Sequence, residues 1–177
     1  MITRRSVVLT GAAALLAGLP QSAALAAPPA AIDPLAIVNA IYARAASGKG
    51  DGGGGFVTNS KATRAKNLSK SLAALWIKAD AHTPKGDVGS VDFDPVTNSQ
   101  EPDVKSFAAA AEKSDPNTAT IAVTITGSNA PRANAADAVI RYDFVRDAGQ
   151  WKIDDIRGAE DGKPWSLRGM LSDALKN

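Results

Sequence analysis

Two adjoining segments with alternating apolar side chains constrain this chain most. They cover residues 138–146 and 149–158, with a short turn around Gly149 between them. Alternation with a period of two is typical of strands that place one face on the core and the other toward solvent. The two segments therefore predict an antiparallel hairpin, whose second strand begins after Gly149 and ends at a turn at Gly158.

Upstream of the hairpin, the sequence predicts two helices. Asp33 is a good N-cap and Pro34 suits the first helical position, so a helix is expected over residues 34–46. A second helix is expected from a cap at residue 59 or 60 to residue 79 or 81, because leucines recur there at helical spacing. Between them, the glycine-rich residues 47–55 predict a flexible loop in which glycine supplies conformational freedom.

The remaining segments complete an α+β order. Residues 118–126 alternate β-branched and small side chains and predict a strand, whereas the alanine-rich residues 104–110 fit either a strand or a helix. A final helix is expected from Trp165 or Ser166. Helices followed by three or four consecutive antiparallel strands favour N-terminal helices packed on a curved antiparallel sheet, with a short C-terminal helix. This arrangement would form a cone with a cleft between helices and sheet.

The N-terminal segment has the three parts of an export signal. Arg4 and Arg5 supply the charge, residues 7–19 form a short apolar run, and residues 24–26 form a small-x-small cleavage site. The paired arginines are typical of the twin-arginine type. We therefore expect a signal peptide over residues 1–26, a flexible lead over 27–32 and a single domain over 33–177, located in the periplasm or secreted.

Composition narrows the function classes. Removing Arg4 and Arg5 from the 20 basic residues leaves 18, which equals the number of acidic residues. A nearly neutral mature chain disfavours nucleic acid as a partner, and the apolar run is too short to predict a membrane span after signal cleavage. The sequence contains no cysteine, which excludes disulfides and thiol nucleophiles. Its one histidine, His82, excludes a multi-histidine metal site.

Three short motifs resemble a known family. Residues 150–156 (QWKIDDI) and 166–171 (SLRGML) resemble the ending of the DUF3828 family of exported bacterial proteins of unknown function. Residues 92–96 (DFDPV), with Gln100 shortly after, resemble the acidic signature in the middle of that family, although Glu101 stands where aspartate is usual. The resemblance implies an NTF2-like, cystatin-like α+β cone and no established reaction.

The expected cleft has a wall and a rim. Its candidate ligand-binding residues are Tyr42, Trp76, Arg141, Trp151 and Asp155 in the wall, and Asp92, Asp94 and Gln100 in a loop at the rim. In an extended segment Asp92 and Asp94 point to one side, so the loop could hold calcium or form solvated Asx-turns.

Asp154 and Asp155 are adjacent acidic residues near the end of the hairpin, and the sequence leaves two roles open for Asp155. If Asp155 shares a face with Trp151 and Ile153, it is inward, needs a partner such as Arg141 or Arg157, and serves either as a base or as a structural carboxylate. Ile156 breaks the alternation, which indicates a β-bulge.

These observations favour a non-catalytic domain that binds a small ligand or an envelope protein in the cleft. No catalytic residue, metal or cofactor is assigned, and a homodimer is left open. One alternative is an NTF2-like hydrolase or isomerase that uses Asp155 or Asp94 as its base. Another is an immunity-type or inhibitor-type protein.

Overall fold

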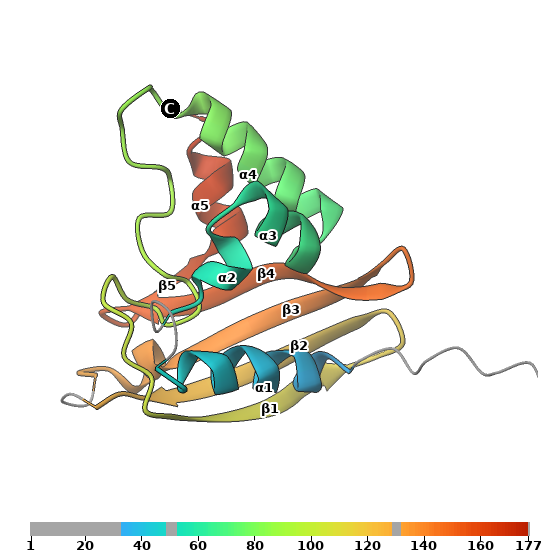
Figure 1. Cartoon of the computed structure of the whole chain (residues 1–177), viewed down its shortest axis with the longest axis vertical. Helices are drawn as coiled ribbons and strands as arrows, with labels where there is room; N and C mark the ends of the chain where they lie inside the picture. Colours follow the sequence, from blue (N-terminus) through green and yellow to red (C-terminus); the bar gives the residue numbers. More distant parts are fainter. Residues whose placement is uncertain (1–32, 49–52, 129–131, 177) are drawn as a thin grey trace, which may run out of the picture. The chain divides into compact units, whose positions relative to one another are not determined.

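The computed structural model describes residues 33–48, 53–128 and 132–176. The chain divides into two compact units, Met1–Ala30 and Ala31–Asn177, and only the second is described below. The expected signal peptide and flexible lead lie outside the described residues. The second unit has the predicted α+β fold, with a curved five-stranded antiparallel sheet and a short C-terminal helix (Figure 1).

The elements follow one another in a simple order. They are α1 (Pro34–Ala45), α2 (Gly55–Thr58), α3 (Lys61–Asn67), α4 (Lys70–His82), β1 (Ser106–Ser114), β2 (Thr118–Thr126), the 3-10 turn η1 (Ala135–Ala138), β3 (Val139–Asp147), β4 (Gln150–Glu160), β5 (Lys163–Ser166) and α5 (Leu167–Asp173). The predicted strand over residues 118–126 is confirmed as β2, and the ambiguous segment over 104–110 belongs mainly to a strand, β1.

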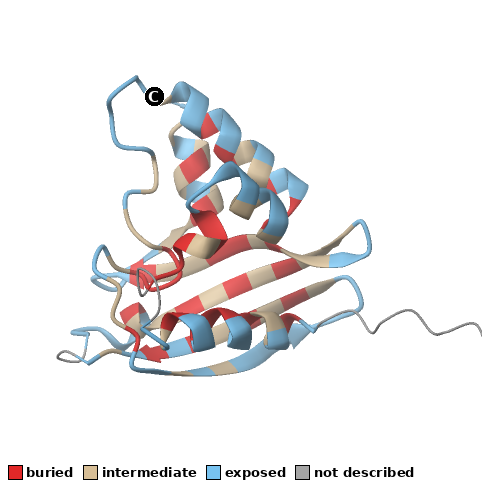
Figure 2. Cartoon of the chain, viewed as in Figure 1, coloured by how far each residue is buried: buried red, intermediate tan, exposed pale blue. Residues whose placement is uncertain are grey.

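The sheet is an antiparallel meander in which each strand pairs with the next, β1-β2-β3-β4-β5. Buried and less buried residues alternate along its central strands, as Figure 2 shows. The buried side chains of β2–β4 form one hydrophobic cluster with those of α1, α4 and α5. The other side of the sheet, here called the open face, carries Thr120, Ala122, Arg141, Asp143 and Arg157.

The predicted second helix is two helices rather than one. α3 ends at Asn67, and Leu68 leaves the helical conformation to form a parallel bridge with Ile153 of β4. The backbone N–H of Ser69 donates to the Ile153 carbonyl at 2.7 Å, and the Ser69 hydroxyl accepts from Leu72 to begin α4. The break buries Leu68 in the core and covers part of the edge of β4.

The hairpin's second strand is longer than predicted. β4 continues through Gly158 to Glu160, and the chain turns at Asp161 and Gly162, which both have positive φ. The segment before α5, expected to lead directly into that helix, forms the edge strand β5. Pro164 is tolerated there because an edge strand has one row of unpaired backbone groups.

The expectation that glycine supplies only freedom in the loop over 47–55 is wrong for Gly53 and Gly54, while residues 49–52 lie outside the described residues. A Cβ at Gly54 would lie 2.1 Å from Val96, and one at Gly53 would lie 2.6 Å from an Asp94 oxygen. Neither has a positive φ. These glycines are needed because another loop passes directly against their backbone.

No helix within the described part of the chain is both long and apolar enough to cross a membrane.

Replacing Gly54 by alanine tests the close approach of the two loops. We expect Gly54→Ala to lower the free energy of unfolding by about 1–3 kcal/mol, because the added methyl overpacks the contact with Val96. Gly89→Ala is the matched control, since a Cβ there meets nothing within 4 Å and φ is not positive. Urea unfolding followed by circular dichroism measures both, and equal stabilities would contradict the steric explanation.

Candidate functional site

The interior between helices and sheet is filled rather than open. Tyr42 is fully buried, and its hydroxyl donates to the carbonyl of Val96 at 2.7 Å. The Tyr142 hydroxyl donates to that of Tyr42 at 3.2 Å. Burial raises the pKa of both phenols, so they remain neutral. Tyr42 therefore links α1, β3 and the loop after Asp94 as part of the core.

Two other residues of the expected wall also pack into structure. Trp76 is 8% exposed, and the guanidinium of Arg64 lies 4.7 Å from its ring centroid. Trp151 is half-buried beside the core, with the guanidinium of Arg146 at 4.2 Å from its ring. Such cation–π contacts stabilise the packing of α3 against α4 and the turn end of the hairpin. The structure does not bring the wall residues together around a cavity.

Asp94 is a structural centre of its loop. Its carboxylate accepts from the backbone N–H of Gly54 at 2.6 Å, from the backbone N–H of Val96 at 3.0 Å and from the Thr97 hydroxyl at 2.9 Å. These bonds hold the glycine segment before α2 against the loop. Three donors from the chain thus already share the two oxygens of this carboxylate.

The other rim residues lie apart from Asp94. Asp92 and Gln100 are exposed and line a small hollow of about 190 Å³ together with Glu160. Among the described residues, no group of three or more histidine or acidic side chains could hold a metal ion. Within the loop, Asp94 accepts an Asx-type hydrogen bond from the Val96 N–H.

Sequence reasoning missed the residues that fix this loop to the sheet. Asn98 has a positive φ, and its buried amide donates to the carbonyls of Asp137 and Ala159 while accepting from the Trp165 indole at 2.9 Å. Arg132 donates to the carbonyls of Asn98 and Thr97. The sequence offered one indication of this role, Asn98 itself, because asparagine tolerates the left-handed backbone conformation that a tight turn requires.

The expected β-bulge is present at Asp154. The register pairs Phe144 with Ile153 but Asp143 with Asp155, so Asp154 is the extra residue. Asp155 therefore lies on the side of the sheet opposite to Ile153, contrary to the expectation that both share a face. Sheet register, which the sequence alone does not supply, decides this point.

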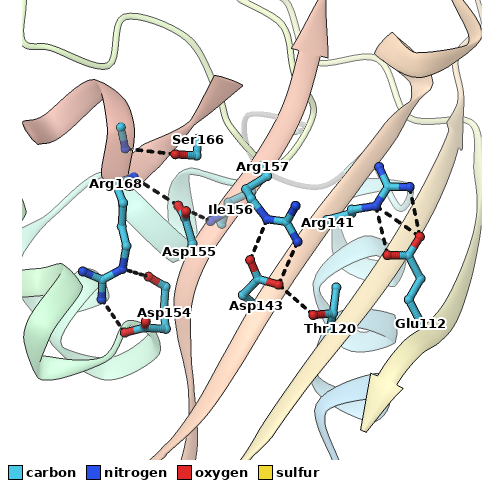
Figure 3. A network of polar contacts seen from close by, with 11 residues as sticks. Glu112, Thr120, Arg141, Asp143, Asp154, Asp155, Ile156, Arg157, Ser166 and Arg168 are labelled. Carbon is cyan, nitrogen blue, oxygen red and sulfur yellow. Dashed lines mark hydrogen bonds and ion pairs between the residues drawn. The ribbon is translucent and has the colours of Figure 1, made fainter. Parts of the chain in front are cut away.

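Asp155 is bound by backbone rather than by an arginine. One carboxylate oxygen accepts from the N–H groups of Ile156 at 2.9 Å and Arg168 at 3.1 Å (Figure 3). Burial raises the pKa of Asp155, and these hydrogen bonds only partly offset that effect. The anticipated partners Arg141 and Arg157 bind other carboxylates.

Like charges face each other across β3 and β4. Arg141 is directly opposite Arg157, and Asp143 is directly opposite Asp155. Such pairs destabilise a sheet unless other groups compensate. Arg157 donates to both oxygens of Asp143, at 2.6 and 2.9 Å, and this carboxylate also accepts from Thr120 at 2.7 Å.

Hydrogen bonding sets the protonation of this pair. Burial acts to raise the pKa of Asp143, but the bonds from Arg157 and Thr120 outweigh it and leave the pKa below its ordinary value. The bond to Asp143 raises the pKa of Arg157. Both groups are therefore charged at neutral pH.

The positive charge of Arg141 is compensated by a carboxylate that lies two strands away in the sheet. Its guanidinium donates to both oxygens of Glu112 on β1, at 2.9 to 3.1 Å, across the intervening strand β2 (Figure 3). Ala122 of β2 is the residue opposite Arg141, and Ala110 of β1 is opposite Ala122. The small alanine side chains leave room for the arginine and glutamate to meet over the sheet.

A groove lies beside these arginines on the open face. It has a volume of about 530 Å³, and its lining residues come from β3, β4, β5 and α5: Arg141, Arg157, Gly158, Pro164, Trp165, Ser166, Gly169, Met170 and Asp173. We call it the open-face groove. Of the eight candidate ligand-binding residues, only Arg141 lines it.

A second hollow of about 530 Å³ lies near the end of β2 and the start of β3. Arg132, Glu101 and Asp103 line it together with residues of β2 and η1. The two terminal nitrogens of Arg132 already donate to loop carbonyls, so its guanidinium serves the loop. The open-face groove is therefore the better candidate for a binding site.

Two substitutions of Asp155 separate its charge from its hydrogen bonds. Asp155→Asn keeps an acceptor for Ile156 and Arg168 and removes the cost of burying a charge, so we expect a stability at pH 7 equal to or above that of the wild type. Asp155→Ala leaves two N–H groups without their acceptor, and we expect a loss of about 1–3 kcal/mol.

The pH dependence gives a further check. Because the pKa of Asp155 is raised on folding, the folded state binds more protons between pH 3.8 and that raised pKa. Wild-type stability relative to Asp155→Asn should therefore improve as pH falls through this window. Urea unfolding at several pH values measures it, and a stability difference independent of pH would contradict the assignment.

Comparison with family models, curated proteins and solved structures gives no match to this chain. The resemblance to the DUF3828 family therefore stays a prediction.

Proposed function

We propose that this chain is an exported, non-catalytic binding domain and that its ligand site is the open-face groove. The observation that carries the proposal is the groove itself, with two partly exposed guanidinium groups at its side and an apolar wall. Its volume of about 530 Å³ lies in the range of small-molecule sites. The helix–sheet interior offers no comparable space, because Tyr42, Leu72 and Tyr142 fill it.

The positions of the two candidate bases favour binding over catalysis. Asp94 already accepts three hydrogen bonds, and Asp155 is buried against the first turn of α5. Neither lines the open-face groove. The single histidine, His82, is exposed at the end of α4 and does not line it either.

Surface composition favours a small ligand over a protein partner. An immunity-type or inhibitor-type protein is expected to present a contiguous exposed apolar patch. Among the described residues, the large apolar side chains that count as exposed are Ile77 on α4 and Val88 in a loop. These two residues do not make a patch of the size that such partners use.

Filling the groove tests the proposal. We expect a library of small organic fragments, titrated into the 15N-labelled protein, to shift the NMR signals of the Gly158 and Gly169 amides. Met170→Trp should weaken the same fragments about tenfold or more, because the larger side chain occupies the groove.

The matched control is Ile77→Trp, which adds the same side chain to an exposed helical position outside the groove. It should bind fragments like the wild type. The proposal fails if no fragment shifts the groove amides, or if Met170→Trp binds the fragments as well as Ile77→Trp does.

Export is tested separately at the paired arginines. We expect the double substitution Arg4→Lys, Arg5→Lys to retain the protein in the cytoplasm at full length, because the twin-arginine route depends on both guanidinium groups. Immunoblots of fractionated bacterial cells measure this, with Arg44→Lys in α1 as a control that should be exported. Unchanged export of the double variant would rule out the twin-arginine route.

A further inference from the structure

We propose that the ligand of the open-face groove is an amphipathic carboxylate, whose acid group binds Arg141 and Arg157 and whose apolar part lies on Pro164 and Met170. This inference rests on the proposed function and adds the chemical class of the ligand. Both arginines and both apolar side chains line the groove.

Two arginines lie directly opposite each other beside the groove. Arg141 and Arg157 form a cross-strand pair on the open face. Glu112 and Asp143 compensate their charges within the fold, yet the two arginines remain neighbours across the strands. An anion bound at this point could therefore contact both guanidinium groups.

The existing ion pairs leave hydrogen-bond donors available on both arginines. Glu112 and Asp143 bind the Nε and Nη2 atoms of Arg141 and Arg157 respectively. The Nη1 atom of each arginine makes no hydrogen bond to any described residue. An incoming carboxylate could therefore bind both arginines without displacing either partner.

The charged residues along the groove favour an anionic ligand. Glu112 and Asp143 do not line it, whereas the arginines they hold do. In Figure 3 both carboxylates lie on the side of the guanidinium groups away from Ser166, which is a lining residue. The one acidic lining residue, Asp173, is paired with Lys176 at 2.7 Å. The groove thus presents positive charge to a ligand.

Apolar residues line the groove next to that charge. Pro164 of β5 and Met170 of α5 both line it, and methionine adds an adaptable apolar surface. The Trp165 ring lies on the other side of the sheet from Arg157, because Trp165 is paired with Gly158, the neighbour of Arg157 in β4. There it packs against the core and donates to Asn98 at 2.9 Å.

Matched probes test the ligand class. We expect 4-phenylbutyrate to shift the Gly158 and Gly169 amides of the full-length protein and to bind at least about tenfold more tightly than the neutral 4-phenylbutanol. Arg157→Gln should reduce affinity for the acid by about tenfold and leave affinity for the alcohol unchanged. Arg146→Gln is the control, because that arginine stacks on Trp151 and does not line the groove.

A second measurement uses only the wild-type protein, so it does not depend on whether a variant folds. Raising sodium chloride from about 50 to about 500 mM should weaken the acid and not the alcohol, because salt screens the attraction. Equal affinity for acid and alcohol, or salt-independent binding of the acid, would overturn the carboxylate assignment while the groove remains a binding site. If neither these probes nor the fragment library shifts the groove amides, the proposed function itself fails.

Discussion

The β-bulge at Asp154 is the constraint on which the rest of the fold depends. Before it, Ile153 faces the helices; after it, Ile156 does so, and Asp155 is turned to the first turn of α5. The Asp154 carboxylate accepts from Ser69 at 2.5 Å and from Arg168 at 2.5 Å. One extra residue thus joins α4, β4 and α5. It also directs β4 so that Arg157 reaches the open face.

Local pattern was sufficient for much of this architecture. The hairpin, the strand over residues 118–126 and the order of elements follow from alternation of side chains along each segment. The split between α3 and α4 could not be found in this way, because Leu68 fits the apolar face of one long helix equally well. Its actual place is decided by a bridge to Ile153, far along the sequence. Strand β5 was missed for a similar reason, since a four-residue edge strand containing Pro164 has no periodic signal.

The candidate site was harder to predict than the fold. Asp92 and Asp94 looked alike in the sequence, yet Asp92 is exposed, whereas Asp94 accepts from the backbone of Gly54, 40 residues away, and from Val96 and Thr97 in its own loop. The opposition of Arg141 and Arg157 depends on a register that the bulge sets, so no spacing in the sequence reveals it. What the sequence did indicate was the bulge itself, from the position of Ile156. Reasoning from that bulge to its register would have placed both arginines on one face.

The meander has a consequence for the order of events during folding. Every strand pairs with its neighbour in the chain, so the sheet can grow by closing short loops, which is entropically cheap. The contact between Ser69 and Asp154 instead spans 85 residues. We therefore expect the sheet to form early and the joint between α3 and α4 to lock onto it late. In that order, the backbone groups of the strands would be paired with one another before the helices close over the sheet.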